Sequence, residues 1–273
     1  MLQVILLMIV GGIGLAQAVS DPRQVTLRWL RLGGLIALPL VAIAVVAAWM
    51  DRSETLIAWP LLLAVALPVT LQLLAVQKAR RQLQRGAATL SYLATCTALT
   101  WVAWTWLTVL EQSVTFIAAP GSVLQLPAVT WAQAVLAPPL TTGLVGGVLV
   151  AMLLGHAYLT AGNEMTQRPF RRLTLVLAGL LAARAVGSLA LALWPYYTHG
   201  PWPWGSPESY ALMITTRYLV GLVVPGVFLY MVYDCVQRRA NQSATGILYV
   251  TAVLVIMGEG AALWLIAATG YVF

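Results

Sequence analysis

The feature that most constrains this chain is a series of long apolar runs that recurs from one end to the other. Eight of them, separated by short polar segments, lie near residues 2–19, 32–50, 56–77, 88–110, 134–158, 173–194, 210–233 and 245–268. A helix of about 20 apolar residues spans the roughly 30 Å hydrocarbon core of a bilayer. The pattern therefore predicts an all-α, polytopic integral membrane bundle of about eight transmembrane helices.

Composition supports lipid as the main solvent of this chain. Hydrophobic residues make up 61% of it and charged residues only 8%, whereas soluble domains carry about a quarter charged residues. We expect a single transmembrane domain over residues 1–273, with no soluble domain. The first run lacks the basic residues that open a signal peptide, so we interpret residues 2–19 as a retained helix. The apolar segment 111–131 is expected to lie along the membrane surface.

Positive charge is concentrated in alternate loops. Of the 15 Lys and Arg residues, 12 follow the first, third, fifth or seventh helix. These are Arg23, Arg28, Arg31, Lys78, Arg80, Arg81, Arg85, Arg168, Arg171, Arg172, Arg238 and Arg239. The positive-inside rule places such loops in the cytoplasm, which predicts both termini on the non-cytoplasmic side of a bacterial cytoplasmic (inner) membrane. The same distribution explains the net charge of +7 without nucleic acid as a partner.

A short internal similarity indicates two related halves. Gly14-Leu-Ala leads to Arg28-Trp-Leu-Arg-Leu, and Gly155-His-Ala leads to Arg168-Pro-Phe-Arg-Arg-Leu. Both segments follow a helix that runs inward, as a parallel duplication requires. We therefore consider a four-plus-four arrangement, with chance similarity as the alternative.

Three ionisable residues lie deep inside apolar runs: Arg184, Arg217 and Glu259. At 1.5 Å per residue, Arg184 lies roughly 16 Å from the inner edge, and Arg217 and Glu259 each about 21 Å. A bare charge at this depth costs about 3 kcal/mol or more, so such residues pair or face a cavity. We expect an Arg217–Glu259 ion pair, with Arg184 satisfied by backbone, water, a partner subunit or a ligand. Tyr210 belongs to this predicted polar site.

His156 and Asp234 are further candidates for a ligand site or a proton path, near the cytoplasmic surface and close to Glu164. Imidazole titrates near neutral pH, so His156 could bind a quinone head group or take up protons; ordinary packing is the alternative. Haem is not expected, because the other histidine, His199, falls in an outer loop on the opposite side.

Tryptophan is concentrated toward the outer side, and a rigid aromatic loop there is a candidate docking surface. It contains Trp194, His199, Trp202 and Trp204. An interfacial aromatic belt is the simpler interpretation. The chain has no HExxH motif, no Asp/His metal cluster and no Ser/His/Asp set, so no metal site and no catalytic residue is predicted.

Three functions from different classes fit these features. The first is a haem-free integral membrane subunit of a respiratory or electron-transfer complex, which binds quinone or conducts protons. The second is a small secondary transporter of an anionic substrate, and the third is a structural or assembly subunit without a small ligand. We rank the first narrowly ahead. The expected partners are the lipid bilayer and other membrane or outer-face subunits, with no covalently bound cofactor.

Overall fold

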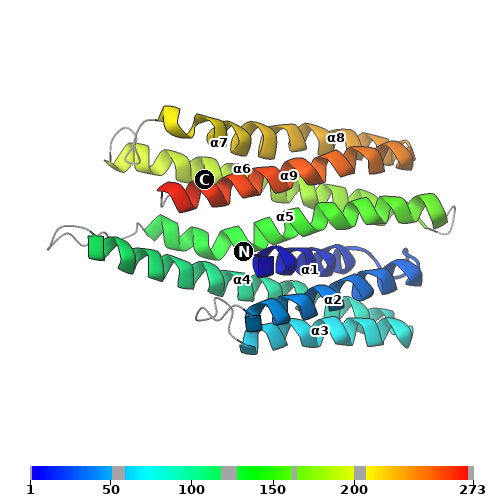
Figure 1. Cartoon of the computed structure of the whole chain (residues 1–273). Helices are drawn as coiled ribbons and strands as arrows, with labels where there is room; N and C mark the ends of the chain where they lie inside the picture. The colour runs from blue at the N-terminus through cyan, green and yellow to red at the C-terminus, as the bar shows by residue number, and fades with distance from the viewer. Residues whose placement is uncertain (1, 51–58, 118–127, 162–164, 200–206, 270–273) are drawn as a thin grey trace.

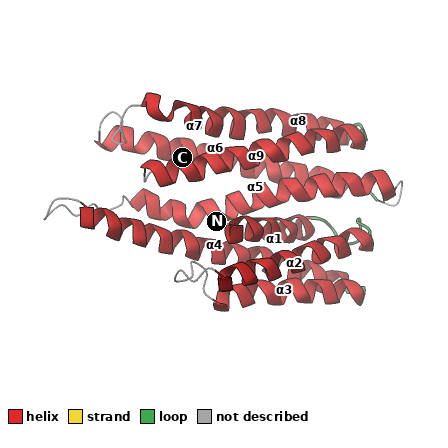
Figure 2. Ribbon diagram, viewed as in Figure 1, coloured by secondary structure: helices red, strands yellow, loops and turns green. Residues whose placement is uncertain are grey.

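The computed structural model describes residues 2–50, 59–117, 128–161, 165–199 and 207–269. Every regular element in these ranges is a helix (Figure 2). In chain order they are α1 (Leu2–Val19), α2 (Leu27–Met50), α3 (Trp59–Gln77), α4 (Arg81–Ile117), α5 (Ala128–Ala161), α6 (Arg168–His199), η2 (Pro207–Tyr210), α7 (Ala211–Thr215), η3 (Thr216–Val223), α8 (Val224–Gln237) and α9 (Asn241–Thr269).

Six of the described segments are long and apolar enough to cross a membrane. They are Leu27–Ala47, Pro60–Gln77, Val135–Thr160, Arg168–Leu193, Ala211–Gln237 and Asn241–Ile266. Helix α1 supplies a shorter apolar segment, Gln3–Val19. These lengths, with the predominantly apolar composition, support an integral membrane protein.

Most helices are longer than the apolar runs predicted. Helix α4 covers Arg81–Ile117 rather than 88–110, and α5 covers Ala128–Ala161 rather than 134–158. A hydropathy window marks only the part of a helix suited to hydrocarbon, whereas backbone hydrogen bonding continues into its polar ends. The segment 111–131, expected along the membrane surface, instead belongs to α4 up to residue 117 and to α5 from residue 128; residues 118–127 lie outside the described part.

The described helices form two units, α1 to α4 and α5 to α9, in which the consecutive elements α7, η3 and α8 act as one long helix. Corresponding helices of the two units make the same contacts (Figure 1). In the first unit, α1 contacts α2 and α4, and α3 contacts both α2 and α4. In the second unit, α5 contacts α6 and α9, and α8 contacts both α6 and α9. The units meet mainly through α1 and α5. There Gly12 faces Gly146 so closely that a Cβ on either would collide with the other backbone, as small residues allow between membrane helices.

The two units also share the turn that leads into their last helix. Ala79 and Arg239 both adopt a left-handed conformation, with φ of 53° and 59°. The Ala79 N–H donates to the Val76 carbonyl at 3.0 Å, and the Arg239 N–H donates to the Val236 carbonyl at 3.2 Å. Left-handed residues commonly end helices in this way. These turns lie outside the short similarity between residues 14–32 and 155–173.

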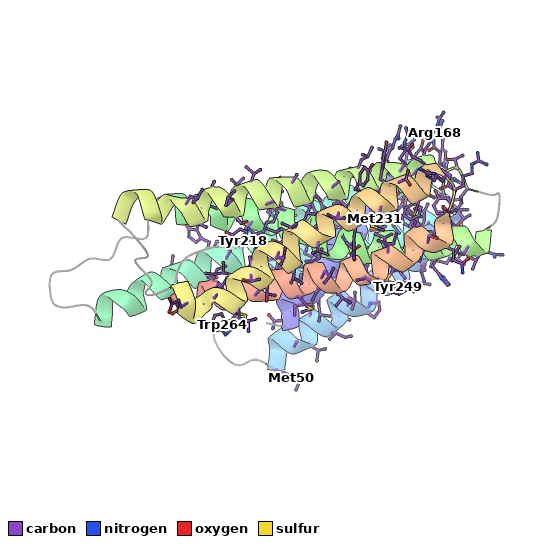
Figure 3. All side chains as sticks on the ribbon, turned by 90° about the horizontal axis from the view of Figure 1, so that it is seen from above. Met50, Arg168, Tyr218, Met231, Tyr249 and Trp264 are labelled. Atoms are coloured by element: carbon purple, nitrogen blue, oxygen red, sulfur yellow. The ribbon has the colours of Figure 1, made fainter. Side chains whose placement is uncertain are left out.

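The basic turns lie together at one end of the bundle, called here the basic end. It holds the α1–α2, α3–α4 and α8–α9 turns, together with the end of α5 and the start of α6, on the right in Figure 1. Helix α1 begins and α9 ends away from it. Figure 3 places Arg168 at the basic end and Trp264 toward the other end.

Candidate functional site

The second unit brings Arg184 of α6, Arg217 of η3 and Glu259 of α9 together in its interior. Their exposed fractions are 4%, 0% and 6%. Arg217 Nη1 donates to Glu259 Oε1 at 2.8 Å, so the predicted ion pair is present. The cluster holds two cations and one anion, which leaves a net charge of +1 inside the bundle.

Arg184 binds the same carboxylate, which differs from the sequence-based expectation that it would need another partner. Its Nε donates to Glu259 Oε1 at 3.3 Å, and its Nη2 donates to Oε2 at 3.2 Å. This two-pronged geometry matches the planar guanidinium to the planar carboxylate. The expectation was wrong because sequence gives the depth of a residue in its helix but not the direction in which its side chain points.

Arg217 contributes only one of its nitrogens to the cluster. Its Nε and Nη2 are buried and have no hydrogen-bond acceptor among the described residues. These two nitrogens form one edge of the guanidinium, the same edge by which Arg184 holds Glu259. An unpaired buried donor costs about 1–3 kcal/mol. The cluster therefore presents an unused fork that suits one more planar, anionic or carbonyl-bearing group.

A π-helix positions Arg217. The stretch expected to be one uninterrupted helix over 210–233 is instead η2, α7, the π-helix η3 and α8. At the end of η3, the Val224 N–H donates to the carbonyl of Leu219, five residues back. Pro225 follows at once and has no N–H to continue an α-helical ladder. Short π-helical segments occur frequently at functional sites, and here the segment carries the buried arginine.

Two glycines let η3 and α9 approach closely beside the charges. A Cβ on Gly221 would collide with Gly258, and a Cβ on Gly258 would collide with Gly221. Gly221 lies four residues after Arg217, and Gly258 directly precedes Glu259. The contact fixes the two helices at the level where the ion pair forms, because no side chain separates their backbones.

Sequence reasoning missed two residues at this site. Thr141 of α5 is 6% exposed, and its Oγ1 lies 3.4 Å from Glu259 Oε2, a long hydrogen bond. Tyr218 lies beside Arg217 in η3, and its hydroxyl donates to the Ser188 carbonyl at 3.1 Å. The signal for Tyr218 was its position next to a buried arginine. Thr141 gave no such signal, since it is 118 residues from Glu259.

The other predicted site residues lie apart from the cluster. The ring of Tyr210 faces Trp264, with centroids 6.1 Å apart. Asp234 pairs with Arg238 one turn along α8, at 2.9 Å, and both side chains are largely exposed. His156 is exposed near the end of α5. The structure thus joins Arg184, Arg217 and Glu259 and gives Tyr210 and Asp234 different partners.

The predicted outer docking surface lies largely beyond the described residues. Trp194 and His199 belong to the last turns of α6, where only the backbone is described. Trp202 and Trp204 fall in 200–206, and Glu164 falls in 162–164, all outside the described part.

Within the described residues, no group of three or more His, Cys, Asp or Glu side chains is placed to hold a metal ion. Comparison with known proteins gave no match to a protein family, a curated protein or a solved structure. The fold and the site define an all-helical membrane protein with a buried, net-positive charge cluster.

Proposed function

We propose that this protein is a secondary transporter that binds a small monocarboxylate, or an anion of similar shape, at the Arg184–Glu259–Arg217 cluster. One observation carries the proposal: a fully buried arginine in a cluster of net charge +1 has one edge of its guanidinium without an acceptor among the described residues. An anionic substrate was the second of the three functions expected from sequence. We now rank it first, because the structure adds the unpaired edge to the excess charge.

The charge of the cluster favours a monoanion. In a low-dielectric interior an uncompensated charge is costly, and a counter-charge removes most of that cost. One negative charge makes the cluster neutral, whereas a dianion would leave a net charge of −1. A cation would meet two arginines that share one carboxylate. The site should therefore select against cations and dianions.

The shape of the free edge favours a carboxylate over a halide. Nε and Nη2 of Arg217 point two parallel N–H groups in one direction, and a carboxylate accepts both. The cluster already contains this arrangement once, between Arg184 and Glu259. A spherical halide would be attracted by the same positive charge but could not accept both parallel N–H groups at two separate oxygen atoms, as a carboxylate does.

The proposed architecture is eight transmembrane helices in two parallel four-helix repeats, with both termini on the non-cytoplasmic side. Two observations support it: the basic turns gather at one end of the bundle, and the two units share their order of contacts and their last turn. Many transporters are built from such repeats. Here the π-helix η3 changes the winding of the continuous helical segment α7–η3–α8 at Arg217.

The test uses purified full-length protein in detergent and in proteoliposomes. Melting temperature is measured with sodium acetate, pyruvate, succinate and chloride at constant ionic strength, and uptake of radiolabelled pyruvate is measured in vesicles. We expect stabilisation by acetate and pyruvate, little effect of succinate or chloride, and saturable uptake. Arg217→Lys keeps the charge but removes the fork, so it should fold and lose most carboxylate-dependent stabilisation. Arg238→Gln, at an exposed pair, is the matched control.

Equal stabilisation by chloride and acetate would reject the carboxylate fit. Binding without uptake in vesicles would reject transport and leave a binding site. A response in Arg217→Lys equal to that of the unchanged protein would remove Arg217 from the site.

A haem-free electron-transfer subunit remains the second candidate, and one observation favours it. His156 is exposed near the end of α5, where a quinone head group arriving from lipid can reach it. In that case redox subunits should copurify, and His156→Ala should lower quinone-dependent activity at unchanged membrane abundance. If the protein purifies without other subunits and quinone analogues change neither its stability nor its activity, this candidate is contradicted. If subunits without redox cofactors copurify, an assembly role is favoured instead.

A further inference from the structure

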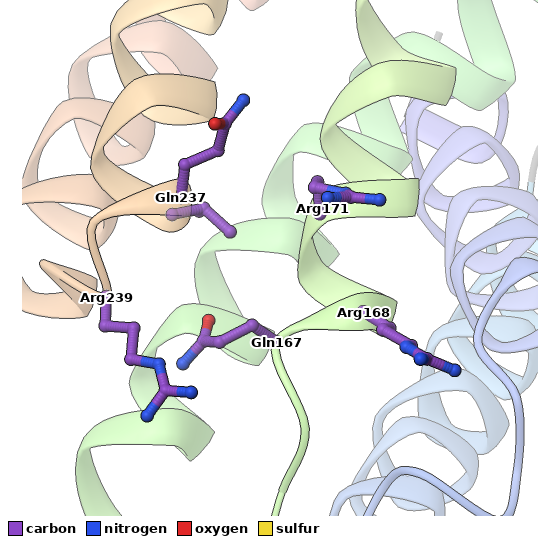
Figure 4. A pocket seen from close by; sticks show the side chains of 6 residues that line it. Gln167, Arg168, Arg171, Gln237 and Arg239 are labelled. Carbon is purple, nitrogen blue, oxygen red and sulfur yellow. The ribbon is translucent and has the colours of Figure 1, made fainter.

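A cavity opens at the basic end of the second unit, away from the buried cluster. Its volume is about 360 Å³. It lies between the start of α6 and the α8–α9 turn and is lined by Gln167, Arg168, Arg171, Val236, Gln237 and Arg239. In Figure 4, Gln167 and Arg239 point toward one another across the gap, whereas the side chains of Arg168 and Arg171 extend from α6 away from it. Three arginines from two segments thus line one cavity, and Arg239 is the one whose side chain is directed across it.

The arginines of this cavity are not paired with acidic groups in the described part of the chain. The described salt bridges involve Arg184, Arg217 and Arg238, and none involves a cavity arginine. The left-handed Arg239 ends α8 and contributes its side chain to the cavity, whereas its neighbour Arg238 pairs with Asp234. Membrane topology explains why arginines occupy this end, but not why three of them line one cavity. Three exposed arginines that line one cavity, without an acidic partner in the described part of the chain, favour a phosphate-bearing ligand.

Gln167 needs a hydrogen-bond donor from the ligand, whereas the arginines need an acceptor. Its Oε1 atom is buried and has no donor among the described residues. An amide oxygen can only accept a hydrogen bond, so a bare phosphate, which has no strong donor when ionised, would leave it unsatisfied. A ligand that carries a hydroxyl near its phosphate would satisfy both the arginines and Gln167.

The surroundings point to lipid as the source of that phosphate. Tyr230, Met231 and Tyr249 are exposed on α8 and α9, by 73%, 43% and 51%. Figure 3 shows Met231 and Tyr249 on the half of the bundle that carries Arg168. Tyrosine favours the membrane–water boundary, and basic pockets between transmembrane helices at this level bind anionic head groups.

We propose that this cavity binds the head group of an anionic phospholipid whose phosphodiester carries a hydroxylated substituent, as in phosphatidylglycerol. The phosphate accepts from Arg239 and from the exposed side chains of Arg168 and Arg171, which turn toward the cavity when the lipid binds, and the head-group hydroxyl donates to Gln167 Oε1. The acyl chains lie along the exposed side chains of α8 and α9. This site is separate from the monoanion cluster and does not depend on it.

The first unit supplies a matched control. Arg28 and Arg31 have the same spacing at the start of α2 that Arg168 and Arg171 have at the start of α6. All four are exposed, but Arg28 and Arg31 do not line this cavity. Neutralising either pair removes the same charge from the basic end, so only a specific site distinguishes the two double variants.

The experiment measures lipid binding to the purified full-length protein by native mass spectrometry. The lipids are phosphatidylglycerol, phosphatidylmethanol (the same charge without a head-group hydroxyl) and phosphatidylcholine, all with the same acyl chains. In the unchanged protein we expect phosphatidylglycerol to bind most tightly, phosphatidylmethanol less tightly and phosphatidylcholine most weakly. At about 1 kcal/mol per arginine, Arg168→Gln with Arg171→Gln should weaken phosphatidylglycerol binding roughly 25-fold, and Arg28→Gln with Arg31→Gln should leave it nearly unchanged. Gln167→Leu should abolish the preference for phosphatidylglycerol over phosphatidylmethanol.

Two results would overturn the proposal. Equal losses in the two double variants would show that general surface charge, not the cavity, attracts anionic lipid. Competition by millimolar inorganic phosphate or glycerol phosphate, at concentrations that displace phosphatidylglycerol, would assign the cavity to a soluble phosphate compound. The comparison of phosphatidylglycerol with phosphatidylmethanol needs no variant, so it tests the hydroxyl contact even if a substitution impairs folding.

Discussion

The guanidinium of Arg217 is joined to the carboxylate of Glu259 through one nitrogen, Nη1, at 2.8 Å. The remaining two nitrogens of Arg217 are buried and have no acceptor among the described residues. Because Glu259 also holds Arg184, a single carboxylate stabilises two buried cations. This sharing makes Glu259 the residue on which the stability of the cluster depends most.

Glu259→Gln should destabilise the protein by about 3–5 kcal/mol, since it leaves two buried guanidinium groups without a counter-charge. Adding Arg217→Gln should restore only part of the loss, because Arg184 stays unpaired. The triple variant with Arg184→Gln should restore more. The measurement is the unfolding free energy in detergent, with the exposed Glu208→Gln as control, expected within about 0.5 kcal/mol of the unchanged protein. Full recovery by Arg217→Gln alone would show that Arg184 does not depend on Glu259.

Two adjacent threonines on α5 should respond in opposite ways to the same substitution. Thr141 Oγ1 lies 3.4 Å from Glu259, so Thr141→Val should cost about 1 kcal/mol. The Thr142 hydroxyl is buried without a partner in the described part of the chain, so Thr142→Val should be neutral or stabilise by about 1 kcal/mol. Melting temperatures of the two variants test this pair, and a larger loss for Thr142→Val would contradict it.

Gly258→Ala should separate η3 from α9, because the new Cβ would collide with the backbone of Gly221. Overpacking of this kind costs about 1–3 kcal/mol, and the Arg217–Glu259 pair should weaken as the helices move apart. Gly260→Ala, two residues along the same helix, meets no atom within 4 Å and should stabilise by about 0.5–1 kcal/mol. Thermal unfolding checks both changes. If Gly258→Ala proved as stable as Gly260→Ala, the close contact would not exist in the membrane.

The proposed topology predicts which fusion points face the cytoplasm. Reporter domains fused after Arg172 and Arg239 should report the cytoplasm, because both residues follow helices that run toward the basic end. Fusions at Ser206 and Phe273 should report the non-cytoplasmic side. Enzymatic reporters active on only one side of the membrane make the measurement. A cytoplasmic signal at Phe273 would remove the eight-helix arrangement.

The sequence by itself determined that this chain is helical and belongs in a membrane. Runs of apolar residues with few charges leave the backbone to satisfy its own hydrogen bonds in lipid, and a helix does so within one segment. The sequence also placed Arg184, Arg217 and Glu259 at similar depths, because the rise per residue of a helix is nearly constant. It predicted the Arg217–Glu259 pair on that ground.

Only the tertiary structure decided how these residues meet. The direction of a side chain depends on the rotation of its helix about its own axis, which hydropathy does not give when a helix is apolar on all sides. That rotation brings Arg184 onto Glu259 and turns Tyr210 toward Trp264. The π-helical turns of η3 set the direction in which the Arg217 side chain leaves its helix. Thr141, which contacts Glu259, lies 118 residues from it in the sequence. Depth follows from the sequence because it is local, whereas facing depends on packing among all the helices.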